Sequence, residues 1–134
     1  MKNKIWLNLV LLLLTLNVYS QTFDELMTIG KEKYDKKDYK GAIISINKAI
    51  ELNPKNSDAY FNRGNCKDDL GDKKGAIDDY SKAIELNPKL ALAYMNRGNC
   101  KSDLGDKKGA CIDLNKALDL GLYQAEKAIK DLCK

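Results

Sequence analysis

The chain has 134 residues, of which 44% are hydrophobic and 31% charged, and its formal net charge is +4. This composition favours one small folded domain and disfavours a disordered chain. The sequence contains no histidine, which excludes Ser-His-Asp and Cys-His catalysis and every histidine-ligated metal site. The charge is too small to indicate an anionic membrane, and we expect no nucleic acid partner.

Residues 1–20 have the layout of a secretory signal. Two lysines precede an apolar run, Ile5–Leu16, and Ser20 places a small residue directly before Gln21. The alternative is an uncleaved membrane anchor, but a span needs about 20 apolar residues and this run is shorter. We therefore expect export, to the periplasm or the medium, with no membrane span after cleavage. Without the two lysines, 21 basic side chains face 19 acidic ones, a charge of +2.

The rest of the chain repeats itself at a constant interval. The segment Asn62–Lys67 recurs as Asn96–Lys101, and Asp69–Ala76 recurs unchanged as Asp103–Ala110. A fainter copy precedes both. Both segments recur after 34 residues. A period of 34 residues is typical of a helical array in which each unit packs on its neighbours. We expect three repeats and a final capping helix, at residues 23–56, 57–90, 91–121 and 122–134.

Each copy reads as two helices joined by a turn. In the second copy, Ser57 is expected to cap a helix that runs to about Leu70. Gly71 ends this helix, because glycine accepts a left-handed conformation. Asp72 caps the next helix, and Pro88 stops it. One helical hairpin cannot bury both its faces, so the stacked copies must supply the core.

Residues 23–121 resemble the tetratricopeptide-repeat family. The large aromatic residue that opens the family's first helix is present as Tyr60 and Tyr94. Gly64 and Ala76 match the small pair at which the two helices of a repeat come close. The resemblance implies an all-α fold: a tetratricopeptide-repeat solenoid of three helix-turn-helix repeats plus a C-terminal capping helix.

The chain departs from the family pattern at recurring positions. Arg63 and Arg97 stand where the family prefers leucine, and Lys67 and Lys101 stand where it prefers tyrosine. The third copy has Leu122 in place of the closing proline. We expect these departures to weaken single matches and to leave the repeat intact.

The resemblance implies that the first helices line a concave groove, which holds a peptide or a partner protein. Two asparagine pairs, each spaced three residues apart, then share one helical face. A side-chain amide both donates and accepts, so it can bind a peptide backbone. Alternatively, these asparagines are solvated or bridge helices. The candidate peptide-binding residues, including two apolar side chains near the same face, are Asn62, Asn65, Asn96, Asn99, Phe61 and Met95.

Some family members clamp a peptide's terminal carboxylate with basic side chains. Met27, Leu92 and Asn96 occupy those places here. Aspartates make this side acidic, so we expect a neutral or basic ligand. These aspartates are Asp58, Asp68, Asp69 and Asp103.

The alternative function is a structural subunit of an envelope assembly or a self-associating adaptor. No sheltered carboxylate pair is expected, and we predict neither enzymatic activity nor a cofactor.

Four cysteines, none in a C-x-x-C pair, predict no metal site. Cys111 lies ten residues before Gly121 and Cys133 lies twelve after it, so an antiparallel hairpin places both at about one level. We expect a Cys111–Cys133 disulfide, with Cys100–Cys111 as the competing pair. Cys66 and Cys100 are one repeat apart, about 8–10 Å or more, which is too far for a bond.

The first prediction is that the mature protein begins at Gln21. The basic start, the apolar run and the small residue at position 20 specify cleavage after Ser20. Intact-mass measurement of protein from an exporting host checks this. A mass that retains residues 1–20 would overturn the export argument.

Overall fold

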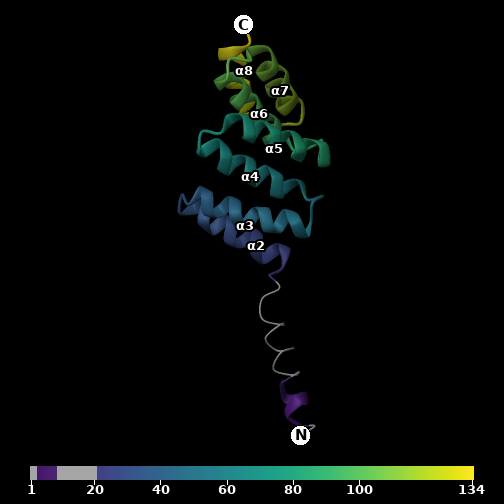
Figure 1. Cartoon of the computed structure of the whole chain (residues 1–134). Coiled ribbons are helices and arrows are strands. Elements are labelled where there is room, and N and C mark those ends of the chain that lie inside the picture. The colour runs from purple at the N-terminus through teal and green to yellow at the C-terminus, as the bar shows by residue number, and fades with distance from the viewer. Residues whose placement is uncertain (1–2, 9–20) are drawn as a thin grey trace.

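The computed structural model describes residues 3–8 and 21–134; residues 1–2 and 9–20, which hold most of the predicted signal segment and its cleavage site, lie outside the described residues. Residues 3–8 are helical. The regular elements of residues 21–134 are all helices, joined by short turns, which confirms the all-α prediction (Figure 1). The helices are α2 Phe23–Asp35, α3 Tyr39–Leu52, α4 Ser57–Asp69, α5 Lys73–Leu86, α6 Ala91–Asp103, α7 Lys107–Asp119 and α8 Ala125–Leu132.

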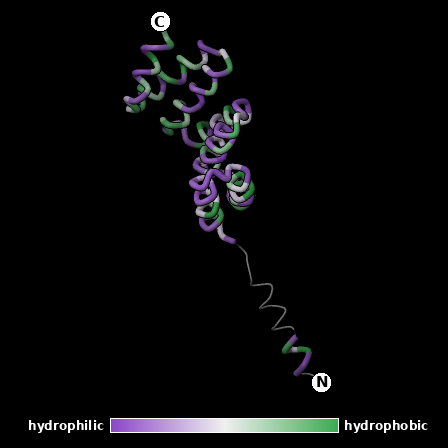
Figure 2. Tube along the Cα trace, turned by 90° about the vertical axis from the view of Figure 1, so that its left-hand side faces the viewer, coloured by the Kyte–Doolittle hydropathy of each residue, from purple (hydrophilic) through white to green (hydrophobic). Residues whose placement is uncertain are grey.

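The helices stack in chain order. Each helix from α2 to α7 packs against the next one along the chain. The hairpins α2–α3, α4–α5 and α6–α7 follow one another, with α2 at one end of the stack and α8 at the other (Figure 1). Hydrophilic and hydrophobic residues are mixed along the stacked helices, as expected where one side of a helix is covered and the other faces water (Figure 2). The arrangement is the predicted helical solenoid.

An aspartate caps the second helix of every hairpin. The Asp72 carboxylate accepts a hydrogen bond from the backbone N–H of Gly75, at 3.0 Å. A Cβ atom at Gly75 would collide with that carboxylate in its present position, so a larger residue there would force the Asp72 side chain to move. Asp38 and Asp106 cap α3 and α7 in the same way.

The cap of α4 differs from the sequence prediction. Asn56, not Ser57, is the N-cap, and its side chain accepts a hydrogen bond from the Ala59 N–H at 3.0 Å. Asn56 has extended backbone angles, φ −87° and ψ 113°, whereas Ser57 is already the first helical residue. A capping side chain must precede the helix, since only there can it reach the free N–H groups of the first turn.

The turn inside each hairpin needs a left-handed residue. Gly71 and Gly105 supply it, with φ of 84° and 87°, as predicted for Gly71. The first hairpin has Lys37 at the same place, with φ of 61°. A side chain in this region clashes with its own backbone, so Lys37 carries a strain that the two glycines avoid.

A glycine of each first helix lies directly against a side chain of the helix that follows. A Cβ atom at Gly64 would lie 2.7 Å from the Tyr80 ring, and one at Gly98 would lie 3.2 Å from Leu114. In the first hairpin, a Cβ atom at Gly30 would meet Ile46 at 2.9 Å. The helices of a hairpin therefore come together as closely as glycine permits.

The recurring departures from the family pattern converge on one buried carboxylate. Arg63 binds both oxygens of Asp79, at 2.8 and 2.7 Å, and Lys67 binds one of them at 2.8 Å. Asp79 is only 4% exposed. The hydrogen bonds to Asp79 raise the pKa of Arg63 further above its usual range. A buried carboxylate is stable only where cations neutralise it, so the three residues form one unit.

The same unit recurs one repeat later and joins neighbouring hairpins. Arg97 and Lys101 bind the buried Asp113 at 2.7 Å each. The remaining guanidinium nitrogen of Arg63 reaches Asn47 on α3 at 2.8 Å, and that of Arg97 reaches Ser81 on α5 at 3.0 Å. Each arginine therefore ties its own hairpin to the preceding one.

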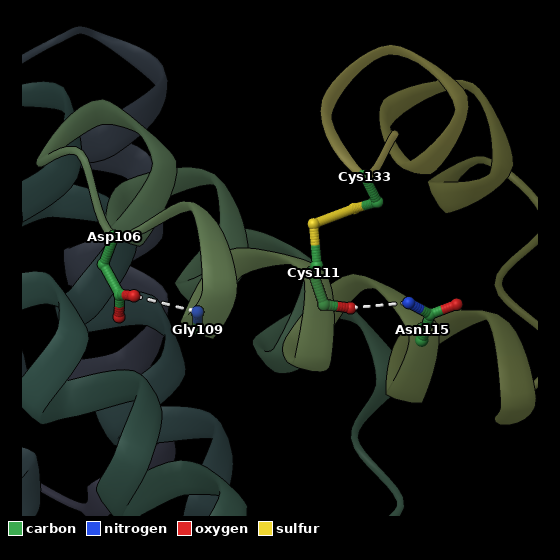
Figure 3. The surroundings of a disulfide bond; sticks show 5 residues. All are labelled: Asp106, Gly109, Cys111, Asn115 and Cys133. Carbon is green, nitrogen blue, oxygen red and sulfur yellow. Dashed lines mark hydrogen bonds between the residues drawn. A yellow bond between two sulfur atoms is a disulfide. The ribbon is translucent and has the colours of Figure 1, made fainter.

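The C-terminal helix α8 covers the last hairpin. Its apolar residues pack on the buried side chains Leu114 and Ala117 of α7. The sulfur atoms of Cys111 and Cys133 lie 2.09 Å apart, with 5.7 Å between the Cα atoms, which is disulfide geometry (Figure 3). Cys66 and Cys100 are buried and unbonded. The competing pair Cys100–Cys111 is therefore not the one that the fold brings together.

Two further findings concern residues 3–8 and 21–134 alone. No helix there is long and apolar enough to cross a membrane. In the same part of the chain, no three cysteine or acidic side chains gather closely enough to hold a metal ion.

Replacing Lys37 with glycine is expected to stabilise the protein by about 0.5–1 kcal/mol, because glycine removes the left-handed strain at the cost of some chain entropy. Thermal or urea unfolding measures the change. Lys36→Gly is the matched control: Lys36 has φ of −83°, so glycine there should lower stability. Equal effects of the two substitutions would contradict the strain argument.

Oxidised protein is expected to contain the Cys111–Cys133 disulfide. Non-reducing peptide mapping checks the pairing, and a Cys100–Cys111 peptide would refute it. The Cys133→Ser variant should be less stable by about 3 kcal/mol under oxidising conditions, because the bond limits the unfolded chain. Under reducing conditions the difference from the unsubstituted protein should disappear.

Candidate functional site

The four predicted asparagines divide into two kinds. The Asn65 side-chain oxygen accepts hydrogen bonds from the Tyr80 hydroxyl at 2.8 Å and from the Asn96 amide at 3.0 Å. Asn65 and Asn96 therefore link α4, α5 and α6, as the helix-bridging alternative proposed. Asn62 is half-buried and Asn99 is exposed. Within residues 3–8 and 21–134, neither of their amides bonds to another side chain, so both are free to bind a ligand.

The two predicted apolar residues, Phe61 and Met95, belong partly to the core. The Phe61 ring lies 5.8 Å from the Tyr80 ring and packs on the cluster that holds Tyr80 and Cys100. Met95 packs on the cluster around Leu114. Both are half-buried, so each can contact a ligand with only part of its surface.

A pocket of about 340 Å³ opens between α2 and α4. Its floor is buried and apolar and is formed by Gly30, Ile46 and Cys66. Burial raises the pKa of the Cys66 thiol to about 11, so the thiol is uncharged at neutral pH. The remaining lining residues, which include two of the predicted asparagines, are Met27, Lys31, Tyr34, Asp35, Asn62 and Asn65.

Sequence reasoning did not find this pocket. The signal was present in the first copy, where Ile46 stands at the place that Tyr80 takes one repeat later. Only the structure shows that the smaller side chain leaves a space and does not draw the helices together.

Charges at the pocket rim are mixed. Lys31 and Asp35 line it, and the Tyr34 hydroxyl donates a hydrogen bond to Asp69. This hydrogen bond raises the pKa of Tyr34 well above its usual range, so the hydroxyl stays protonated. The Asp69 carboxylate therefore lies close to the rim.

Two of the predicted aspartates share one lysine. Lys73 contacts both Asp68 and Asp103, the latter at 2.9 Å, and these hydrogen bonds raise its pKa. Negative charge therefore remains along this face: Lys73 offsets one of the two charges of Asp68 and Asp103, and Asp35, Asp58 and Asp69 add to it.

A second hollow, wide and shallow, of about 660 Å³, lies over α6 and α7 beside the Cys111–Cys133 bond. Its one buried side chain, Asp113, is bonded to the partly exposed Arg97 at 2.7 Å. The other lining residues are half-buried or exposed and include Lys108, Lys116 and Asp119, so this hollow is charged and lacks the buried apolar floor of the pocket between α2 and α4.

Solved structures share the fold. The "Arabidopsis OM64 TPR domain" is 29% identical, with a TM-score of 0.79, over 82% of this chain and 93% of that one. The first TPR of Spaghetti, solved bound to the HSP90 peptide SRMEEVD, is 24% identical over 84% and 97% of the two chains, with a TM-score of 0.73. The translocator chaperone SycD of Yersinia enterocolitica is 17% identical over 90% of each, with a TM-score of 0.80.

Sequence comparison gives the same family three times, and two of the matches coincide with the hairpins α4–α5 and α6–α7. No curated protein matches the chain. Tetratricopeptide-repeat family models match residues 30–66, 57–90 and 91–120. These matches cover most of the described helices, and the chain therefore belongs to the tetratricopeptide-repeat family.

Proposed function

We propose that this protein is a non-catalytic protein–protein interaction scaffold, which holds an extended peptide or a segment of a partner protein across α2, α4 and α6. The observation that carries the proposal is the free amide of Asn62 at the rim of an apolar pocket. An open pocket with a polar group beside it can take a ligand side chain and the neighbouring backbone together.

The asparagines suit a peptide backbone. An extended chain presents one donor and one acceptor at each residue, and an amide side chain complements both. Asn62 on α4 and Asn99 on α6 supply two such amides on successive first helices. The hydrogen bond from Asn96 to Asn65, at 3.0 Å, lies between these helices and limits their relative movement.

Charge favours a neutral or basic ligand. The Spaghetti domain is bound to SRMEEVD, whose sequence contains two glutamates and an aspartate. Here Met27 and Asn96 stand at two places where a carboxylate clamp needs cations. Asp35 and Asp69, near the pocket, would repel an acidic segment.

Export is part of the proposal. The sequence of residues 1–20 supports a periplasmic or secreted site of action, where an oxidising environment favours the Cys111–Cys133 bond.

The alternative function is a structural subunit of an envelope assembly or a self-associating adaptor. Ile44 and Ile112, 58% and 62% exposed on the second helices, favour that alternative. A concentration-dependent mass in sedimentation equilibrium would support it.

The Asn62→Ala, Asn99→Ala double variant is expected to bind peptides about tenfold more weakly or worse, because each lost hydrogen bond is worth about 1 kcal/mol. The probes are ten-residue peptides selected from a random displayed library on the immobilised full chain. Fluorescence polarisation then measures the dissociation constant of each selected peptide.

Asn115→Ala is the control, because the Asn115 amide donates only to the Cys111 carbonyl of its own helix. It should leave every dissociation constant unchanged. If the library yields no peptide, or if the double variant binds as well as the control, the proposed function is wrong.

A further inference from the structure

The pocket between α2 and α4 exists because of one difference between two repeats. Ile46 and Tyr80 occupy the same place in the first and second hairpins. The Tyr80 ring lies over Gly64 and is fully buried, and its hydroxyl reaches Asn65. Ile46 lies over Gly30 in the same way but has no ring. The space that the phenol ring fills in the second repeat is therefore open in the first.

Part of the surroundings of this space recurs in the next repeat, where Gly30, Asn62 and Cys66 have identical counterparts, whereas Lys31 and Tyr34 are replaced by Asn65 and Asp68. Met27 corresponds to Phe61, which packs against the Tyr80 ring. Asn62 corresponds to Asn96, and Cys66 corresponds to Cys100, which belongs to the same buried cluster as Tyr80. The protein thus contains, in its next repeat, an example of the side chain that these walls accommodate.

We infer that the pocket between α2 and α4 receives an aromatic side chain of the bound peptide, followed or preceded by a basic residue. The inference rests on the proposed function and names the class of peptide. The ring would lie beside Ile46, which covers Gly30, in the space that the outer part of the Tyr80 ring fills in the second repeat.

The chemistry of the walls suits a ring. The Met27 thioether lines the pocket, and a thioether makes favourable contacts with aromatic rings. The Lys31 ammonium at the rim can lie over a ring face. The floor, formed by Ile46 and an uncharged Cys66 thiol, provides no polar group for a hydrophilic side chain.

The basic neighbour follows from the charges at the rim. Asp35 lines the pocket, and Asp69 is bound to the Tyr34 hydroxyl beside it. Among the lining residues Lys31 and Asp35 balance each other, and Asp69 beside them adds one negative charge. A lysine or arginine next to the aromatic residue would meet this added charge.

Filling the pocket from inside tests the inference. The Ile46→Phe variant places a ring where Tyr80 has one, without a hydroxyl, since Lys31 stands in place of the acceptor Asn65. Ile44→Phe makes the same change on an exposed position of the same helix and is the control. Both variants are first compared with the unsubstituted chain by circular dichroism and thermal unfolding.

Two probes are used with each variant. The first is the set of library-selected peptides, which we expect to share an aromatic residue beside a lysine or arginine. Ile46→Phe, but not Ile44→Phe, should weaken their binding by about tenfold or more, the effect of losing one buried side chain. The second is N-acetyl-phenylalaninamide, which should shift the backbone NMR signals of Gly30 and Cys66 in the unsubstituted chain and in Ile44→Phe only.

The outcomes separate the two proposals. Selected peptides that depend on Asn62 and Asn99 but tolerate Ile46→Phe, or that lack an aromatic residue, would overturn the inference and leave the proposed function standing. Failure of the library with binding of N-acetyl-phenylalaninamide would overturn the function and keep an aromatic-binding pocket. If neither probe binds, both are wrong. If Ile46→Phe unfolds, Met27→Phe, which narrows the pocket with the residue found at position 61, replaces it.

Discussion

The contact between a glycine of each first helix and one side chain of the following helix sets the geometry of the stack. Gly30, Gly64 and Gly98 recur once in every repeat, and each would clash with or press on its neighbour if it had a Cβ atom. Because the hairpin is held at this distance by backbone, it does not tighten when the neighbouring side chain is smaller. The difference between Ile46 and Tyr80 therefore appears as a pocket on the face of the stack, rather than as a shift of helices.

Ionic and hydrogen-bonding contacts of the arginines hold each hairpin against the preceding one. A leucine at the position of Arg63 would bury apolar surface but could not neutralise Asp79, and Asp79 would then keep only the lysine as its partner in the interior. The arginine and the aspartate therefore occur together, in the second and third repeats and not in the first, where Ile29 and Ser45 occupy the corresponding places. The arginine also reaches the preceding hairpin, so that one side chain fixes both the angle within a repeat and the distance between repeats.

These two constraints leave the face of the first helices available for binding. Part of its polar surface is used internally, by the Asn65–Asn96–Tyr80 hydrogen bonds and by Lys73 between Asp68 and Asp103. What remains free, the amides of Asn62 and Asn99 and the rim around the α2–α4 pocket, is held by a rigid frame. Preorganised groups of this kind bind a ligand with little loss of their own freedom. At the far end, α8 closes the stack and covers Leu114 and Ala117.

The sequence by itself determined the repeat, the number of hairpins, the glycine turns and the close approach at Gly64, because these depend on local backbone chemistry and on a period that can be counted. It also placed Cys111 and Cys133 at one level, since helix rise is constant. Only the tertiary structure decided which polar side chains bond to each other and which stay free. Arg63, Lys67 and Asp79 meet across two helices, and Asn65 accepts a hydrogen bond from Tyr80. The α2–α4 pocket was likewise decided by the tertiary structure. Its volume depends on side chains that three helices bring together, and no single segment of the chain determines it.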